Sequence, residues 1–270
     1  MKNIMSVVGT VALALWTSLA VAQETPQTAL DEGRVERATE LMLQQSTNDD
    51  AETSVSGLVG MAQMALSQGN LKEAARHVDE ARQKTAALKK NSGWHVVVAW
   101  IAAKIDVAQG DMTKATEDIR QARACIENGA MVALSWTGAV QYLASQIYEA
   151  DNAKARKAAE AAIAVYLETK QPHERAHARL RLGDLELARG KARRASLEYE
   201  AAIRDFHLAQ NVEECTARAQ LHIARKFLDA NDLRAARARM KFAQRDMEIA
   251  GNPKELVAMY DEIQNALQTP

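Results

Sequence analysis

The chain has 270 residues, of which 47% are hydrophobic, 26% charged and 4% aromatic, and its formal net charge is −1. This composition excludes a collagen-like chain and a low-complexity disordered one, and the abundance of Ala, Leu, Glu, Arg, Lys and Gln favours helices over strands. We therefore expect an all-α protein that is long enough to bury a sizeable core.

Residues 1–22 have the features of a secretory signal peptide. Lys2 gives a positive start, Ile4 to Leu19 is apolar, and Ala20-Val21-Ala22 matches the small-x-small pattern of a cleavage site. Cleavage after Ala22 would produce an exported bacterial protein, periplasmic or secreted, that begins at Gln23. The alternative is an uncleaved anchor, since the apolar run is almost long enough to span a bilayer, and the protein would then be a membrane-anchored assembly or sensor subunit.

Residues 23–53 are expected to form an N-terminal tail and a leading helix. The start, Gln23 to Thr28, is polar and contains Pro26, which predicts a frayed end. From Leu30 to Gln45 the apolar residues follow a helical stripe. The polar run from Ser46 to Asp50 predicts a loop.

Residues 54–252 repeat one pattern five times. Its turn residues are 40 or 41 positions apart: Gly69, Gly110, Ala150, Gly190 and Asn231. We number positions by their distance from the turn residue. Position −7 is mostly small: Ala62, Ala103, Leu143, Gly183 and Ala224. Positions +5 and +12 are always Ala: Ala74, Ala115, Ala155, Ala195, Ala236, and Ala81, Ala122, Ala162, Ala202, Ala243. Position +9 varies and is often larger: Val78, Ile119, Ala159, Tyr199 and Met240.

A helix hairpin explains these positions physically. Gly or Asn permits the sharp turn between two antiparallel helices, and small residues let the helices approach closely. The larger residue at +9 would fill the gap between neighbouring hairpins, and because one hairpin cannot bury its apolar face alone, the hairpins should stack. The second helices are expected to be capped by Asn70, Asp111, Asn152 and Asp232.

This signature resembles the tetratricopeptide repeat, most clearly at Gly183, Gly190, Ala195, Tyr199 and Ala202. The resemblance covers about residues 54–250, and its period of 40–41 exceeds the standard 34. It implies a right-handed superhelix of about five hairpins. A leading half-repeat would stand in front, at Gly33, Ala38 and Met42. Residues 253–270, which begin with a helix-compatible proline, would form a C-terminal capping helix.

The sharpest candidate for chemistry is His173-Glu174-Arg175-Ala176-His177, a match to H-E-x-x-H. On a helix the two histidines share a face and could hold Zn²⁺, with Glu174 as the base that acts on a water. This resembles the zincin metallopeptidase motif. A third ligand is lacking, however, because Glu198 should lie about 7 Å along the helix axis from the place where one is needed. A zinc-dependent hydrolase is therefore the alternative, and a protein without catalysis or cofactor is the preferred interpretation.

Two other features favour structural roles. Cys125 and Cys215 fall two to three repeats apart, beyond the ~7 Å Cα separation that a disulfide allows, so two packed thiols are expected. The basic stretches Arg189 to Arg194 and Arg234 to Lys241 are interleaved with Ala and lack an aromatic platform, which favours a solvated helix face over a nucleic-acid site.

The resemblance implies a binding scaffold whose first helices line an inner groove. Trp100 beside Lys104, together with two arginines, could take an apolar anchor and an acidic group, although Trp100 could instead pack between hairpins. We expect a protein or peptide partner in the envelope, no nucleic acid, and no membrane insertion after the signal peptide is cleaved. The predicted groove residues are Gln63, Trp100, Lys104, Gln141, Tyr148, His177, Asp184, Arg218, His222 and Arg225.

Overall fold

The computed structural model describes residues 24–209 and 212–268, and the predicted signal peptide lies outside them. These described residues form thirteen helices and no strand, so the prediction of an all-α helical-repeat protein is confirmed. No helix within these ranges is both long and apolar enough to cross a bilayer. The chain divides into two compact units between Ile147 and Tyr148, and each is described by itself.

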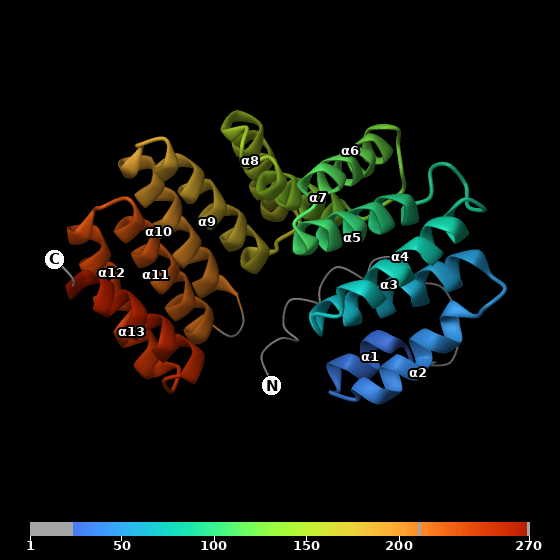
Figure 1. Cartoon of the computed structure of the whole chain (residues 1–270), viewed down its shortest axis with the longest axis horizontal. Helices are drawn as coiled ribbons and strands as arrows, with labels where there is room; N and C mark the ends of the chain where they lie inside the picture. The colour runs from blue at the N-terminus through green and yellow to red at the C-terminus, as the bar shows by residue number, and fades with distance from the viewer. Residues whose placement is uncertain (1–23, 210–211, 269–270) are drawn as a thin grey trace. The chain divides into compact units, whose positions relative to one another are not determined.

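Unit 1 contains seven helices among its described residues, and its hairpins α3/α4 and α5/α6 are the first two predicted repeats (Figure 1). The first helices pack in series, α3 on α5 and α5 on α7, while α4 and α6 each pack on the next first helix. The bounds are α1 Pro26–Asp31, α2 Val35–Ser46, α3 Ala51–Ser67, α4 Leu71–Thr85, α5 Trp94–Gln109, α6 Met112–Glu127 and α7 Leu134–Ile147.

The frayed start predicted for Gln23 to Thr28 is wrong from Thr25 onward, because Thr25 caps α1 and the helix begins at Pro26; Gln23 lies outside the described residues. Thr25 caps this helix: its hydroxyl accepts from the Thr28 backbone N–H at 3.1 Å, and the Thr28 hydroxyl accepts from the Thr25 N–H at 2.9 Å. Helices α1 and α2 meet at Gly33, which has a φ of 75°. The predicted half-repeat therefore has a short first helix as well.

Unit 2 contains six helices among its described residues, including the hairpins α9/α10 and α11/α12 (Figure 1). Helix α9 packs on α11 and α11 on α13, and α13 also contacts α12, the position expected of a capping helix. The bounds are α8 Asn152–Glu168, α9 Pro172–Ala188, α10 Ala192–Leu208, α11 Val212–Asp229, α12 Leu233–Ile249 and α13 Lys254–Gln268.

The repeat positions form the core of each hairpin. Every residue predicted at −7, +5, +9 and +12 is buried. Four of the five turn residues adopt the left-handed backbone expected of them, with φ of 74° at Gly69, 79° at Gly110, 71° at Gly190 and 59° at Asn231. The register read from the sequence therefore matches the packing register.

One hairpin shows how tightly positions −7 and +9 are coupled. A Cβ atom added to Gly183 would lie 2.4 Å from Cε1 of Tyr199, which is fully buried. The corresponding pair in α5/α6 is Ala103 and Ile119. The bulkiest residue at +9 is thus accommodated by the residue without a side chain at −7.

The helix caps follow the predicted pattern with one exception. The side chains of Asn70, Asp111 and Asp232 accept hydrogen bonds from backbone N–H groups three residues on, at 3.3, 3.0 and 3.0 Å. The cap predicted at Asn152 is wrong. Asp151 caps α8, because the cap directly follows the turn residue, and Asn152 instead donates from its side chain to the Leu185 carbonyl at 3.1 Å.

Candidate partner-binding surfaces

In unit 1, Trp100 packs between two first helices. Its indole N–H donates to the Ala139 carbonyl of α7 at 3.2 Å, and its ring meets Trp136 edge-on with centroids 5.2 Å apart. Lys104 Nζ lies 4.6 Å from the centroid of the Trp100 ring, within cation–π range, and burial lowers the pKa of Lys104. A partner at this surface would meet an ammonium group supported by an indole.

In unit 2, Asp184 connects a core residue to the α9/α11 face. The Tyr199 hydroxyl donates to Asp184 Oδ1 at 2.8 Å, and His222 Nε2 lies 3.0 and 3.1 Å from the two carboxylate oxygens. Burial, and then the charge of Asp184, raises the pKa of Tyr199 above its usual range, so the phenol keeps its proton. Since a carboxylate only accepts, His222 must carry a proton on Nε2, and in the neutral imidazole this leaves Nδ1 as an acceptor.

His173 and His177 form a packed pair at the start of α9. Their Nε2 atoms are 3.3 Å apart, and both rings meet Phe206 edge-on, at centroid distances of 5.6 and 5.1 Å. Burial, and then the charges of His173 and His222, lowers the pKa of His177 to about 4. His177 is therefore neutral at pH 7, as expected for an imidazole that packs against a phenyl ring.

The two arginines in and beside the H-E-x-x-H motif form ion pairs. Arg175 binds both carboxylate oxygens of Asp205, at 2.8 and 2.5 Å. Arg179 bridges Asp205 and Glu198, each at 2.9 Å, so the acidic residue considered as a third zinc ligand faces a guanidinium group. Within residues 24–209 and 212–268, no group of three His, Cys, Asp or Glu side chains is arranged to hold a metal ion.

The two predicted groove arginines pair with the capping helix. Arg218 lies 2.9 Å from Glu214 and 3.6 Å from Glu255, and Arg225 pairs with Glu262. Both Glu255 and Glu262 are on α13 and largely exposed, so these pairs are weak and a partner's carboxylate could replace them. Sequence analysis missed this competition because the acidic partners lie more than 30 residues along the chain.

The other predicted groove residues have plainer surroundings. Tyr148 packs against a buried cluster that includes Ala155 and Leu182. Gln63 on α3 and Gln141 on α7 are half-buried.

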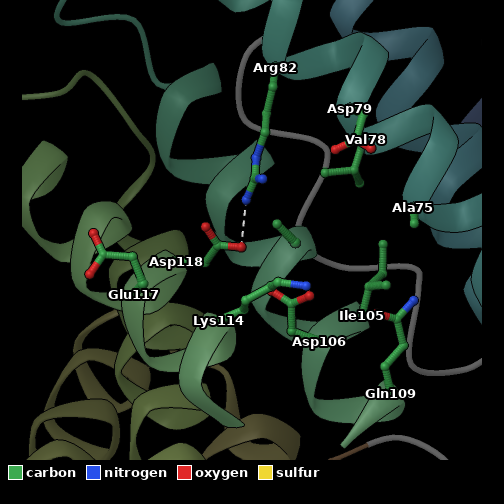
Figure 2. A pocket seen from close by; sticks show the side chains of 11 residues that line it. Ala75, Val78, Asp79, Arg82, Ile105, Asp106, Gln109, Lys114, Glu117 and Asp118 are labelled. Carbon is green, nitrogen blue, oxygen red and sulfur yellow. Dashed lines mark hydrogen bonds and ion pairs between the residues drawn. The ribbon is translucent and has the colours of Figure 1, made fainter. Parts of the chain in front are cut away.

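A pocket that sequence analysis did not predict lies between α4, α5 and α6 in unit 1 (Figure 2). It has a volume of about 310 Å³. Arg82 reaches in from α4 and binds Asp118 at 2.5 Å. Burial, and then a hydrogen bond with Asp118 and its charge, raises the pKa of Asp106 to about 6, against the opposing charges of Arg82 and Lys114. The feature of the sequence that could have indicated this pocket is the pair Asp106 and Asp118, at positions −4 and +8 of the α5/α6 hairpin.

The two cysteines are part-buried free thiols, Cys125 on α6 and Cys215 on α11. Burial raises the pKa of both, and the charge of Glu214 adds to the effect at Cys215. A raised pKa reduces the thiolate fraction, so neither environment activates a nucleophile.

Comparisons with known proteins agree on the fold. No family model and no curated protein sequence matches the chain. Among solved structures, BtubC (BKLC) from P. vanneervenii is similar with a TM-score of 0.66 and 16% identity, covering 86% of this chain and 94% of that one. A kinesin light chain candidate from Podosopora anserina with nearly identical TPR-like repeats gives 0.55 and 18%, covering 80% and 97%. A Rap protein complexed with competence and sporulation factor gives 0.63 and 11%, covering 88% and 70%. The chain therefore has the tetratricopeptide-like helical-repeat fold.

Proposed function

We propose that this protein is an exported interaction scaffold that binds a protein or peptide on the faces of its first helices and performs no catalysis of its own. The small residues at the repeat positions meet the needs of stacking, so they carry no partner specificity. The first helices additionally carry Trp100, Lys104, Asp184 and His222 in fixed arrangements. The Rap protein of similar fold is complexed with competence and sporulation factor, which shows that such a fold can hold another molecule.

The observation that carries this proposal is the Tyr199–Asp184–His222 chain of contacts. Tyr199 holds Asp184 from the core, Asp184 orients the imidazole, and the His222 side chain remains 35% exposed. A preoriented acceptor at Nδ1 can take a hydrogen bond from a peptide N–H or hydroxyl at a small entropic cost. Arg218 and Arg225, on the same helix as His222, favour an acidic group on the same partner.

Site-specific photo-crosslinking in cells tests the proposed face. A photoreactive residue at Arg218, one turn from His222 on α11, is expected to give a discrete crosslinked product. The same residue at Lys157, exposed on α8, is the matched control and is expected to give none. His222→Ala should weaken the Arg218 product about tenfold, the effect of losing one well-placed hydrogen bond, without changing helicity. Equal products from both positions, or a product that His222→Ala leaves unchanged, would contradict the assignment.

Export rests on residues 1–22 and has its own test. We propose cleavage after Ala22, so the protein isolated from the envelope should begin at Gln23. Intact mass measurement distinguishes this chain from one that retains Met1. Retention would favour the membrane-anchored assembly or sensor subunit instead.

A further inference from the structure

The second helices of the last two hairpins carry matching exposed stripes. On α10 the stripe is Arg193, Leu197, Glu200, Arg204 and Leu208, and on α12 it is Arg234, Ala238, Lys241, Arg245 and Ile249. All ten residues are exposed, and they occupy the same repeat positions, +3, +7, +10, +14 and +18. Steps of three and four residues keep each stripe on one side of its helix.

The two stripes lie on neighbouring helices and have an excess of positive charge. Arg239 of α12 pairs with Glu200 of α10 at 3.5 Å, which joins the helices and neutralises the single acidic residue in the stripes. In the part of the chain that the structure describes, Arg193, Arg204, Arg234 and Lys241 have no ion pair. Arg245, the fifth cation of the stripes, pairs with the buried Asp246 at 3.1 Å. Four of the five cations are therefore available to an anionic partner.

Apolar side chains accompany these charges. Leu208 is 70% exposed and Ile249 is 64% exposed, at the same end of the two stripes. Beside them on α12, Phe242 is 46% exposed, and the Arg245 guanidinium lies 5.9 Å from its ring centroid. Exposed apolar side chains are not stabilised by contact with water or with the phosphate backbone of a nucleic acid. A membrane surface, which is anionic outside and apolar beneath, accommodates both the basic and the apolar side chains.

The second helices of the earlier hairpins lack this combination. In the α3/α4 hairpin, position +14 is Gln83 and position +18 is Ala87, which lies beyond the end of α4. In α8 these positions are Ala164 and Glu168. The Arg and aliphatic pair is specific to α10 and α12. A solvated face alone gives no reason for two hairpins to share it at identical positions.

We propose that the exposed stripes of α10 and α12 bind the surface of an anionic phospholipid membrane, a role beyond that of the first-helix faces. Positions +3 and +14 stand about 16 Å apart along each helix, so the basic groups are distributed over an extended area. A bilayer offers anionic headgroups at any such spacing. Arg193, Arg204, Arg234, Lys241 and Arg245 contact the headgroups, while Leu208, Ile249 and Phe242 enter the interface.

Vesicle co-sedimentation tests the charge contribution. The chain from Gln23 onward, which contains all the described helices, is mixed with vesicles of phosphatidylglycerol and phosphatidylcholine, or of phosphatidylcholine alone, at physiological ionic strength. It is expected to sediment with the anionic vesicles only. The fourfold variant Arg193→Gln, Arg204→Gln, Arg234→Gln and Lys241→Gln, at the four cations without an ion pair, should reduce this affinity by at least about tenfold.

A matched control separates the stripes from net charge. Lys72→Gln, Lys84→Gln, Lys89→Gln and Lys157→Gln remove the same charge from exposed positions elsewhere, and binding should stay within about twofold. Equal losses in the two fourfold variants would overturn the proposal, since overall charge would then explain binding. Failure to bind anionic vesicles at all would also overturn it and would favour an acidic protein as the partner of these stripes.

The apolar contribution is tested at constant charge. Leu208→Ser with Ile249→Ser should weaken vesicle binding several-fold. Leu43→Ser with Leu167→Ser, on α2 and α8 and more than half exposed, should not. Equal effects of the two pairs would overturn the assignment of the interface to α10 and α12. Circular dichroism confirms that each variant keeps its helices.

Discussion

The hairpins α5/α6 and α9/α10 carry acidic residues at the same two repeat positions but neutralise them differently. At −4 and +8, α5/α6 has Asp106 and Asp118, which hydrogen-bond to one another. At the same positions α9/α10 has Glu186 and Glu198. There each carboxylate has its own cationic partners, so the two hairpins share a register and differ in electrostatics.

The difference follows from which arginines lie within reach. Glu186 lies 2.6 Å from Arg156 of α8 and 3.4 Å from Arg189, and Glu198 binds Arg179. In α5/α6 the short Asp118 binds Arg82, and Asp106 is left beside another carboxyl group. The repeat therefore fixes where side chains meet, while the residues from neighbouring helices decide what charge they meet.

The largest effect on stability is expected from substitutions that remove the steric difference between the two hairpins. Gly183→Ala should lower the free energy of unfolding by about 3 kcal/mol, because the new Cβ would overlap the buried Tyr199 ring at 2.4 Å. Adding Tyr199→Ile gives α9/α10 the Ala and Ile pair of α5/α6. Urea denaturation of the two single variants and the double variant should show the double variant to be more stable than the sum of the single effects predicts. Simple additivity would contradict the coupling of positions −7 and +9.

A smaller effect is expected from removing Arg156, the cation that pairs with Glu186 at position −4 of α9/α10. Arg156→Gln leaves the Glu186 side chain, which is 4% exposed, with only Arg189 beside it. The free energy of unfolding should fall by about 2 kcal/mol, less than for a fully unpaired buried charge. Lys154→Gln, which removes an exposed pair with Asp151 on the same helix, is the control and should cost less than about 0.5 kcal/mol. Equal losses of stability in the two variants would mean that the ion pair with Arg156 does not stabilise the buried Glu186.

The smallest expected effect depends on pH and concerns Asp106. Because its folded-state pKa is raised to about 6, its protonated form stabilises the fold at acidic pH, and this contribution is lost as pH rises from about 4 through 6. Asp106→Asn imitates the protonated acid, so above pH 6 it should be more stable than the unmodified protein, by about 1 kcal/mol after allowance for solvent screening. Thermal denaturation between pH 4 and pH 8 measures the difference. The two proteins should converge near pH 4.

Asp79→Asn provides the control for net charge, because Asp79 lines the same pocket from α4. A stability difference between Asp106→Asn and the unmodified protein that does not change with pH would contradict the raised pKa of Asp106. So would an identical pH profile for the two variants.

The core could be predicted from sequence because its constraints are steric and repeat with the turn. The burial of Ala74, Ala115 and Ala155 at position +5 required only the correct period. The short helix α1 was missed because its capping box uses Thr28 where the usual signature has Glu or Gln. The error at Asn152 came from placing the cap two positions after the turn, where the other hairpins have it one position after.

The polar surfaces were less predictable because their partners come from distant helices. The contact of Asp184 with His222 spans 38 residues, and that of Arg82 with Asp118 spans 36, about one repeat in each case. An alignment of the repeats indicates which positions can lie close together. Whether a side chain there contacts an acidic, a basic or an aromatic residue depends on the local geometry. The ion pairs of Arg218 and Arg225 with α13 lie outside the repeat and had no counterpart in it.

If a partner binds the α9/α11 face as proposed, the Tyr199 hydroxyl couples that binding to folding. Tyr199 fills the core at position +9, yet its hydrogen bond ends on Asp184, whose carboxylate also contacts His222 at the α9/α11 face. A partner that donates hydrogen bonds to the Asp184 carboxylate would compete with the Tyr199 hydroxyl for it. Binding of a ligand at this face should therefore change the stability of the α9/α10 hairpin. Substitutions in the core of that hairpin should in turn change the affinity for the ligand.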